Sequence, residues 1–129
     1  MHKDEHELIL AMSYLLDRVS FEPNIDVGFV ASSKCLRDRA REIFLQMHSQ
    51  TAKAFRPDLK VYNKTSIGFR NGSTIRFHPM NGNHMKGTSI KYLIVAKGHN
   101  DTRAFEELRN SILPVISSMR DGKFMVMEV

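Results

Sequence analysis

The sequence predicts an α/β fold: a single three-layer domain built on a mainly parallel sheet with one antiparallel hairpin. Apolar residues at helical spacing alternate with short apolar runs, which is typical of strands joined by crossover helices. Residues 60–78 change to strand-like alternation around Asn71-Gly72, which indicates the hairpin. The run Tyr92-Leu93-Ile94-Val95 is apolar throughout, as in a strand covered on both faces. The length of 129 residues fits one domain, 1–129.

The first part of the chain is predicted to alternate helix, strand and helix. Residues 4–19 carry apolar side chains at helical spacing, and residues 27–31 read as a short buried strand after a break. Ser32 or Ser33 is expected to cap the next helix by accepting a backbone N–H, and that helix is expected to stop before Pro57. Its apolar face consists of Leu36, Ala40, Ile43, Phe44, Met47, Thr51 and Phe55.

The length of the hairpin loop follows from the positions of Ile67 and Ile75. A two-residue loop would place these two side chains on opposite faces of the sheet. A loop of three residues, 70–72, with Gly72 in the left-handed region, brings them to the same face and pairs Phe69 with Ser73. The sequence therefore predicts a three-residue turn with a bulge.

The last part of the chain is predicted to hold a loop, the central strand, a helix and a final strand. Residues 79–87 are rich in Gly and Asn and read as a loop before the strand through 92–95. Asp101 or Thr102 is expected to cap the helix, and Pro114 to cause a kink or an irregular final turn near Leu113. The final strand covers 124–127. The helix carries its apolar face on Phe105, Leu108, Ile112, Val115, Ile116 and Met119.

The charge suits an acidic partner. The net charge is +5 and the pI is near 9.6, as in many proteins that bind nucleic acid, although a solvated surface is the alternative explanation. The candidate nucleic-acid contacts are the basic residues of the hairpin and loops, with a second patch on the second helix. They are Lys64, Arg70, Arg76, Lys86 and Lys91, and then Arg37 and Arg41.

Membrane and metal sites are not expected. The apolar runs are too short to span a bilayer and the start has the wrong polarity for a signal peptide, so we expect a cytoplasmic protein. His2 to His6 matches the H-x-x-E-H zinc signature, but it lies at a terminus without an identified third ligand, so a polar helix start is favoured. The lone Cys35 is expected to be a bystander thiol.

The end of the central strand is where chemistry is expected. In open parallel sheets, ligands bind outside the carboxyl ends of the strands, which here means residues 96–99. This stretch reads Ala96, Lys97, Gly98 and His99, and it contains no carboxylate.

The element order and several motifs resemble the ATPase domain of phage terminase large subunits, the motors that package viral DNA. The resemblance implies a truncated P-loop NTPase core, in which the first helix follows a Walker A loop and the strand through 92–95 ends in the Asp-Glu of Walker B. The stretches that carry it are VGFVASS at 27–33, FRNGSTIRF at 69–77, MKGTSIKYLIV at 85–95 and KFMVMEV at 123–129.

The residues that such an ATPase needs are replaced. The start MHKDEHE supplies neither the glycines nor the preceding strand of a phosphate-binding loop. Ala96 and Lys97 stand at the degenerate Walker B position, where the family holds Mg²⁺ and orients water. The last strand ends with Glu128 where the family has Ser or Thr. We therefore expect neither catalysis nor a cofactor.

Two functions follow from the resemblance and its departures. The first is a non-catalytic phage protein with a terminase-like fold, which binds double-stranded DNA or a protein partner in viral DNA packaging. The second is a protein-interaction or regulatory module. A missing first strand would expose a sheet edge beside residues 27–31, which could pair with a second copy or with a phage or host protein.

Overall fold

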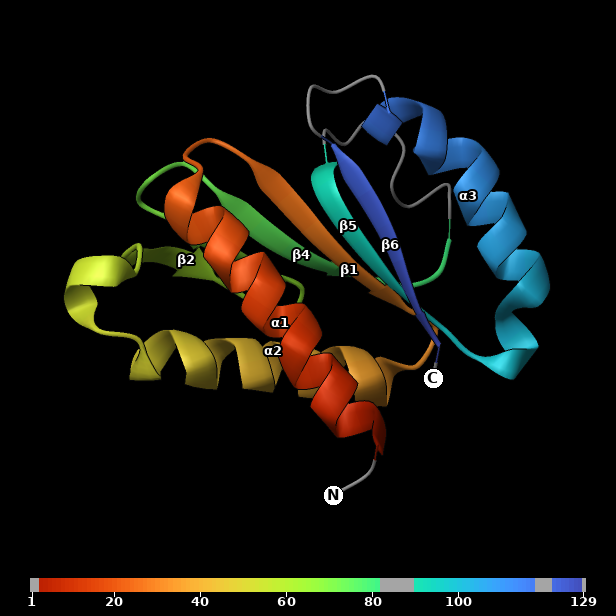
Figure 1. The fold of residues 1–129 in the computed structure, drawn as a ribbon, viewed down its shortest axis with the longest axis horizontal. Helices are drawn as coiled ribbons and strands as arrows, with labels where there is room; N and C mark the ends of the chain where they lie inside the picture. Colours follow the sequence, from red (N-terminus) through yellow and green to blue (C-terminus); the bar gives the residue numbers. More distant parts are fainter. Residues whose placement is uncertain (1–2, 82–89, 118–121, 129) are drawn as a thin grey trace.

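The computed structural model describes residues 3–81, 90–117 and 122–128. Helices and strands alternate along most of this chain, with a hairpin between β3 and β4 (Figure 1). The helices are α1 (Lys3–Phe21), α2 (Lys34–Gln50) and α3 (Thr102–Ser117), with short 3₁₀ turns η1 (Lys53–Phe55) and η3 (His99–Asp101). The strands are β1 (Asp26–Ala31), β2 (Leu59–Tyr62), β3 (Ser66–Phe69), β4 (Thr74–His78), β5 (Ile90–Lys97) and β6 (Lys123–Glu128).

The strands form one six-stranded sheet in the order β2-β3-β4-β1-β5-β6. β1 pairs in parallel with β4 and β5, β5 pairs in parallel with β6, and β2, β3 and β4 are antiparallel neighbours. The predicted α/β class is confirmed. The predicted open edge beside residues 27–31 is wrong, because the hairpin returns β4 to the side of β1 that faces away from β5. The edges of the described sheet are β2 and β6.

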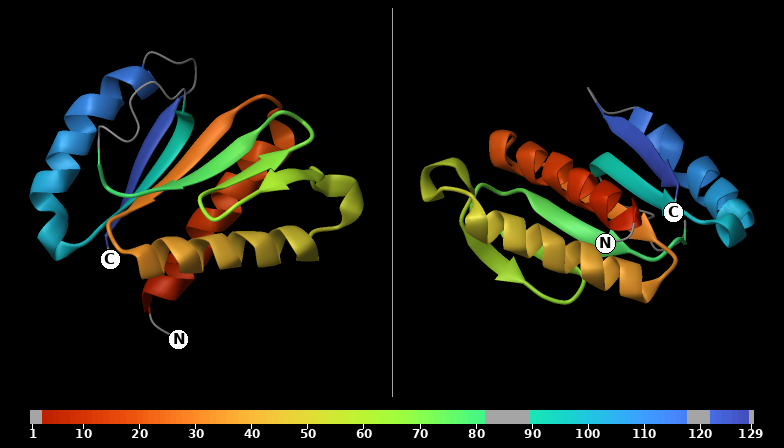
Figure 2. Two further views of the ribbon diagram at one scale, coloured as in Figure 1. Left: turned by 180° about the vertical axis from the view of Figure 1, so that it is seen from behind. Right: turned by 60° about the horizontal axis from the view of Figure 1, so that its bottom comes forward.

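The helices cover the sheet in three layers, with α1 and α2 on one face and α3 on the other (Figures 1 and 2). β5 contributes to both cores, as its unbroken apolar run predicts. Tyr92 and Ile94 pack with α1 and α2, whereas Leu93 and Val95 pack with α3. No described helix is long and apolar enough to cross a membrane.

The hairpin has the predicted three-residue turn. Ile67 pairs with Ile75, and the Phe69 amide donates to the Ser73 carbonyl at 2.9 Å. Gly72 has φ +87°, which an L side chain rarely adopts, and its amide donates to the Phe69 carbonyl at 3.1 Å. The register is therefore set by the need to bury both isoleucines on one face.

The second helix ends earlier than its apolar spacing predicts. Ser33 caps its start, since the Ser33 Oγ accepts from the Leu36 amide at 3.2 Å. Thr51 leaves the helical conformation, and its amide and hydroxyl both donate to the Met47 carbonyl, at 3.1 and 2.9 Å. The chain then forms η1, and Phe55 is 71% exposed instead of continuing the apolar face.

The C-terminal elements differ from the prediction in detail. α3 passes through Pro114 and continues to Ser117, so the irregular final turn expected near Leu113 is not found. A kink at this position stays a prediction. Met119 and most of the predicted loop at 79–87 lie outside the described residues.

Candidate functional site

A hollow of ≈ 260 Å³ lies at the carboxyl ends of β1 and β5, where ligands of parallel sheets are commonly bound. Ser32 and Ser33, which follow β1, line this hollow together with Leu36 at the start of α2 and Ala96 near the end of β5. The remaining wall is formed by residues 98–101. Three of the residues predicted to lie at the site of chemistry line this hollow: Ala96, Gly98 and His99.

The two residues predicted to stand at a degenerate Walker B position have apolar surroundings. Ala96 is 1% exposed and belongs to the core shared with α1 and α2. The Lys97 ammonium lies 5.2 Å from the ring centroid of Phe105, a distance that suits a cation–π contact. β5 therefore brings a methyl group and an ammonium to the end of the sheet, and no carboxylate.

A carboxylate nevertheless lines this hollow: that of Asp101, which the sequence predicted only as a possible cap of the following helix. Asp101 Oδ1 accepts from the Ser32 hydroxyl at 2.9 Å, and Oδ2 accepts from the Gly98 amide at 2.8 Å. The Asp101 amide donates to the Gly98 carbonyl at 3.2 Å, so the residue closes the η3 turn rather than capping α3. In the sequence, the signal for this contact is the spacing of three residues between Gly98 and Asp101.

The metal-binding candidates find no support in the described part of the chain. No group of three or more His, Cys, Asp or Glu side chains is arranged there to hold a metal ion. His6 and His99 are exposed, and Cys35 is an exposed free thiol. His2 and His84 lie outside the described residues.

Three of the predicted nucleic-acid contacts come together beside α2. Arg37, Arg41 and Lys64 line two adjoining hollows of ≈ 160 and ≈ 270 Å³, and Lys34 lines both of them. We call Lys34, Arg37, Arg41 and Lys64 the α2 basic surface. Lys64 comes from the loop between β2 and β3, so the surface joins segments that are distant in the sequence.

Backbone carbonyls hold the two arginines of the α2 basic surface in place. Arg37 Nη1 donates to the carbonyls of Ala31 and Ser32 at 2.7 and 3.1 Å, and Arg41 Nε donates to the Asn63 carbonyl at 2.9 Å. Their charges are not cancelled by these contacts, because a carbonyl oxygen carries no net charge. These hydrogen bonds fix the positions of both guanidinium groups.

Acidic residues reduce the positive charge of this surface. Lys34 Nζ lies 2.7 Å from Asp38 Oδ2, and this hydrogen bond is the main reason that the pKa of Asp38 lies below its ordinary value. Glu42 lines one of the hollows and pairs with Arg39 at 3.0 Å. The α2 basic surface thus keeps a modest excess of positive charge.

The remaining predicted contacts lie elsewhere. Arg76 is exposed on β4 and points to the face opposite α2, since its neighbours Ile75 and Phe77 pack toward α1 and α2. Arg70 is exposed in the hairpin turn, and Lys86 lies outside the described residues. Arg76 and the α2 basic surface therefore do not form one continuous interface.

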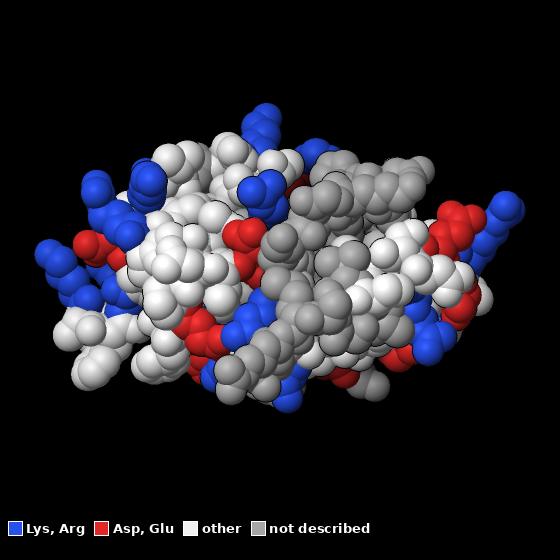
Figure 3. Space-filling view, turned by 90° about the horizontal axis from the view of Figure 1, so that it is seen from above, with Lys and Arg blue, Asp and Glu red and all other residues white. Residues whose placement is uncertain are grey.

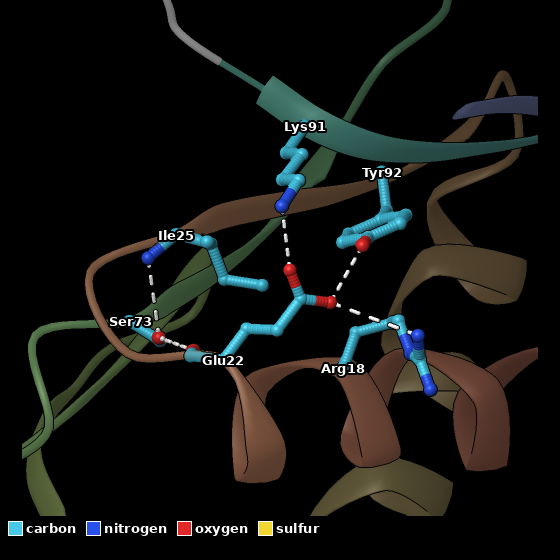
Figure 4. A network of polar contacts seen from close by, with 6 residues as sticks. All are labelled: Arg18, Glu22, Ile25, Ser73, Lys91 and Tyr92. Carbon is cyan, nitrogen blue, oxygen red and sulfur yellow. Dashed lines mark hydrogen bonds and ion pairs between the residues drawn. The ribbon is translucent and has the colours of Figure 1, made fainter. Parts of the chain in front are cut away.

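Lys91 is engaged in a polar network at the amino end of β5 (Figure 4). Its Nζ lies 2.6 Å from Glu22 Oε1, and the Tyr92 hydroxyl donates to Glu22 Oε2 at 2.5 Å. Arg18 Nη1 lies 3.7 Å from the same oxygen. Lys91 is thus paired within the protein, which leaves it less suited to a nucleic-acid contact than its charge predicts.

The network shifts the pKa values of its members. Burial opposes ionisation of Glu22, but the hydrogen bonds from Lys91 and Tyr92 and the charges of Lys91 and Arg18 outweigh burial and lower its pKa. The hydrogen bond to Glu22 raises the pKa of Lys91, while burial and then the same carboxylate raise the pKa of Tyr92. These shifts mark a structural link between α1 and β5.

Solved structures with the same architecture identify the fold. The chain aligns with the ATPase domain of the large terminase of Thermus phage P74-26 at a TM-score of 0.76 over 98% of its length, with 12% sequence identity. A point mutant of that domain gives the same values. The chain has the fold of a phage large terminase ATPase domain. It spans 56% of the length of those solved chains. Neither a known family nor a curated protein matches its sequence.

The end of β5 does not fit a magnesium-bound nucleotide. Mg²⁺ requires oxygen ligands, usually carboxylates. Ala96 offers none, and the Lys97 ammonium at the end of the same strand would repel the ion. The terminase-like fold is therefore present with a different set of side chains at this position.

Proposed function

We propose that this protein has a terminase-like fold without ATP hydrolysis and that it acts in viral DNA packaging by binding duplex DNA. The observation that carries the first part is the chemistry at the end of β5, where Ala96 and Lys97 replace metal-holding carboxylates. The α2 basic surface supports the second part, because ordered guanidinium groups suit phosphate oxygens.

Phosphate release tests the loss of hydrolysis. The purified chain with ATP and Mg²⁺ is expected to release no more phosphate than a heat-denatured sample. A calorimetric titration with ATP should give the same result with and without Mg²⁺, because no residue at the end of β5 would hold the ion. Magnesium-dependent turnover would refute this part of the proposal.

Salt-dependent binding tests the DNA contact. Duplex DNA of arbitrary sequence should bind in a gel shift and dissociate steeply as salt rises, because counterion release drives such binding. Lys64→Ala should lower the slope of log K against log salt by about one. Arg109→Ala on the exposed surface of α3 is the matched control and should leave the slope unchanged. Salt-insensitive binding, or equal effects of both variants, would refute the assignment.

Protein association through a sheet edge is the second candidate function. β6 pairs only with β5 among the described strands, and Val126 on it is 43% exposed. An unpaired edge with apolar side chains is a site for pairing with another strand. Light scattering across a concentration series tests this candidate. A monomer at every concentration would exclude self-pairing, and Val126→Lys should abolish any dimer that forms through this edge.

A further inference from the structure

A groove at the carboxyl end of α1 exposes two phenylalanine rings. It has a volume of ≈ 340 Å³ and lies between the end of α1, the η1 turn and the hairpin turn. We call it the Phe21–Phe55 groove. Its wall includes Ser20, Phe21, Phe55, Arg56, Pro57 and Asn71.

Both rings are available to a ligand. Phe21 is 70% exposed and Phe55 is 71% exposed, so neither ring belongs to the core. A single exposed apolar side chain needs no explanation, but two large aromatic rings in one groove form a patch of the kind that marks binding sites. The groove therefore offers two flat apolar surfaces to a planar partner.

Positive charge surrounds the two rings. Arg56 lines the groove, and Arg56 Nη1 donates to the carbonyls of His48 and Ser49 at 3.0 and 2.9 Å, which fixes the guanidinium beside Phe55. Lys53 is exposed on the same 3₁₀ turn, and Arg70 is exposed next to Asn71. Figure 3 shows Lys and Arg side chains gathered at the end of the molecule that η1 and β2 form.

Acidic residues near the groove are fewer. Asp58 follows Pro57 and is exposed, and its carbonyl accepts from the Arg70 amide at 2.8 Å. Asp17 is exposed one helical turn before Phe21. Glu22 is turned toward Lys91 and Tyr92, and those contacts satisfy its carboxylate. The surroundings of the groove thus have an excess of positive charge.

We propose that the Phe21–Phe55 groove binds unpaired nucleotides of a single-stranded nucleic acid. The bases stack on Phe21 and Phe55, and the phosphates contact Lys53, Arg56 and Arg70. Aromatic rings flanked by cations are the common device for binding single strands, because every base has a stacking face. The bases of a duplex already stack on each other, so a duplex offers no free base face to Phe21 and Phe55. This inference goes beyond the proposed function and shares no residue with the α2 basic surface.

Fluorescence anisotropy with a labelled oligothymidylate tests the proposal. Phe21→Ala and Phe55→Ala should each weaken binding by about tenfold, the order of magnitude for losing one stacked base. Leu10→Ala is the matched control, because Leu10 is 58% exposed on α1 and lies about 16 Å from Phe21 along the helix. All three variants should melt at the wild-type temperature, since none of these side chains is buried.

Conservative variants separate stacking from general apolar contact. Phe55→Tyr should bind the oligothymidylate as the wild type does, whereas Phe55→Leu should bind as Phe55→Ala does. Equal binding by the Leu variant and the wild type, no binding by the wild type, or an equal loss with Leu10→Ala would overturn the proposal. A concentration-dependent dimer that Phe55→Ala abolishes would overturn it too and assign the groove to a second copy of the chain.

The same samples distinguish this inference from the proposed function. Lys64→Ala should weaken duplex binding and spare the oligothymidylate, whereas Phe55→Ala should do the reverse. If the wild type binds the oligothymidylate but no duplex, the proposed function fails and the groove assignment stands. If only the duplex binds, the groove assignment fails and the proposed function stands.

Discussion

The Ser32 hydroxyl donates a 2.9 Å hydrogen bond to Asp101 Oδ1, which joins the end of β1 to the turn after β5. The two residues are 69 positions apart in the sequence. Asp101 also accepts from the Gly98 amide at 2.8 Å, so a single carboxylate holds both strand ends at the hollow where a terminase-like fold is expected to bind its ligand.

Asp101→Ala should destabilise the fold, because it leaves the Gly98 amide and the Ser32 hydroxyl without their acceptor. The expected loss is about 1 to 2 kcal/mol of unfolding free energy, typical of a lost cap. Ser32→Ala removes one of the two contacts and should cost less. Urea denaturation measures both, with the exposed neighbour Asn100→Ala as the control. A wild-type midpoint for Asp101→Ala would contradict the structural role.

Gly72→Ala should also destabilise the fold. Gly72 has φ +87°, and a Cβ there would clash with the Asn24 side chain, which would have to move. The left-handed conformation alone costs an L residue about 1 to 2 kcal/mol. Gly68→Ala is the control in urea denaturation, since its Cβ would meet its nearest atom at an ordinary 3.6 Å. Equal midpoints for the two variants would contradict the prediction.

Pro114→Ala should stabilise the protein. Pro114 lies inside α3 and is exposed, and as a proline it cannot donate the backbone hydrogen bond of a helix interior. Restoring that donor should raise the unfolding free energy by about 1 to 3 kcal/mol. Ser111→Ala is the control, because it removes only the Ser111 hydroxyl's 3.0 Å bond to the Glu107 carbonyl. An unchanged or lowered urea midpoint for Pro114→Ala would show that Pro114 does not destabilise this helix.

Local sequence patterns predicted the features that depend on near neighbours. Ile67 and Ile75 share one face of the sheet only if the hairpin loop has three residues, and this fixed the predicted loop length. The apolar run at 92–95 predicted a strand buried on both faces. Ser33 was one of two predicted caps because short polar side chains compete for free amides at helix starts. Each of these features is decided within a few residues along the chain.

Features that depend on distant partners could not be read from the sequence. One local feature was missed as well: the apolar periodicity of α2 continued to Phe55, yet the extended conformation of Thr51 ends the helix. The pairing of β4 with β1 joins segments that are far apart in the sequence, so no local pattern indicates it. The predicted open edge beside β1 was wrong for this reason. The pairing of Lys91 with Glu22 likewise joins β5 to the end of α1, and no local pattern around Lys91 indicated this partner.

Glu22→Gln should lower stability near neutral pH by about 1 kcal/mol, the usual size for a charged hydrogen bond that is partly exposed. The folded protein lowers the pKa of Glu22 from its ordinary value of 4.5. Its contribution is therefore fully present above that value and is lost as the pH falls through the lower, folded pKa. The gap in unfolding free energy between wild type and Glu22→Gln should close over this acid range.

Titration of Lys91 and Tyr92 does not contribute to the change in this gap with pH. Their pKa values are raised from the ordinary 10.5 and 10.0, so both groups keep their protons in acid. Asp17→Asn is the control, because it removes an exposed carboxylate of the same helix that makes none of the Glu22 contacts. Urea denaturation at a series of pH values gives each gap. A Glu22→Gln gap that widens as the pH falls would contradict the sign of the shift, since it would mean that folding favours the protonated carboxyl.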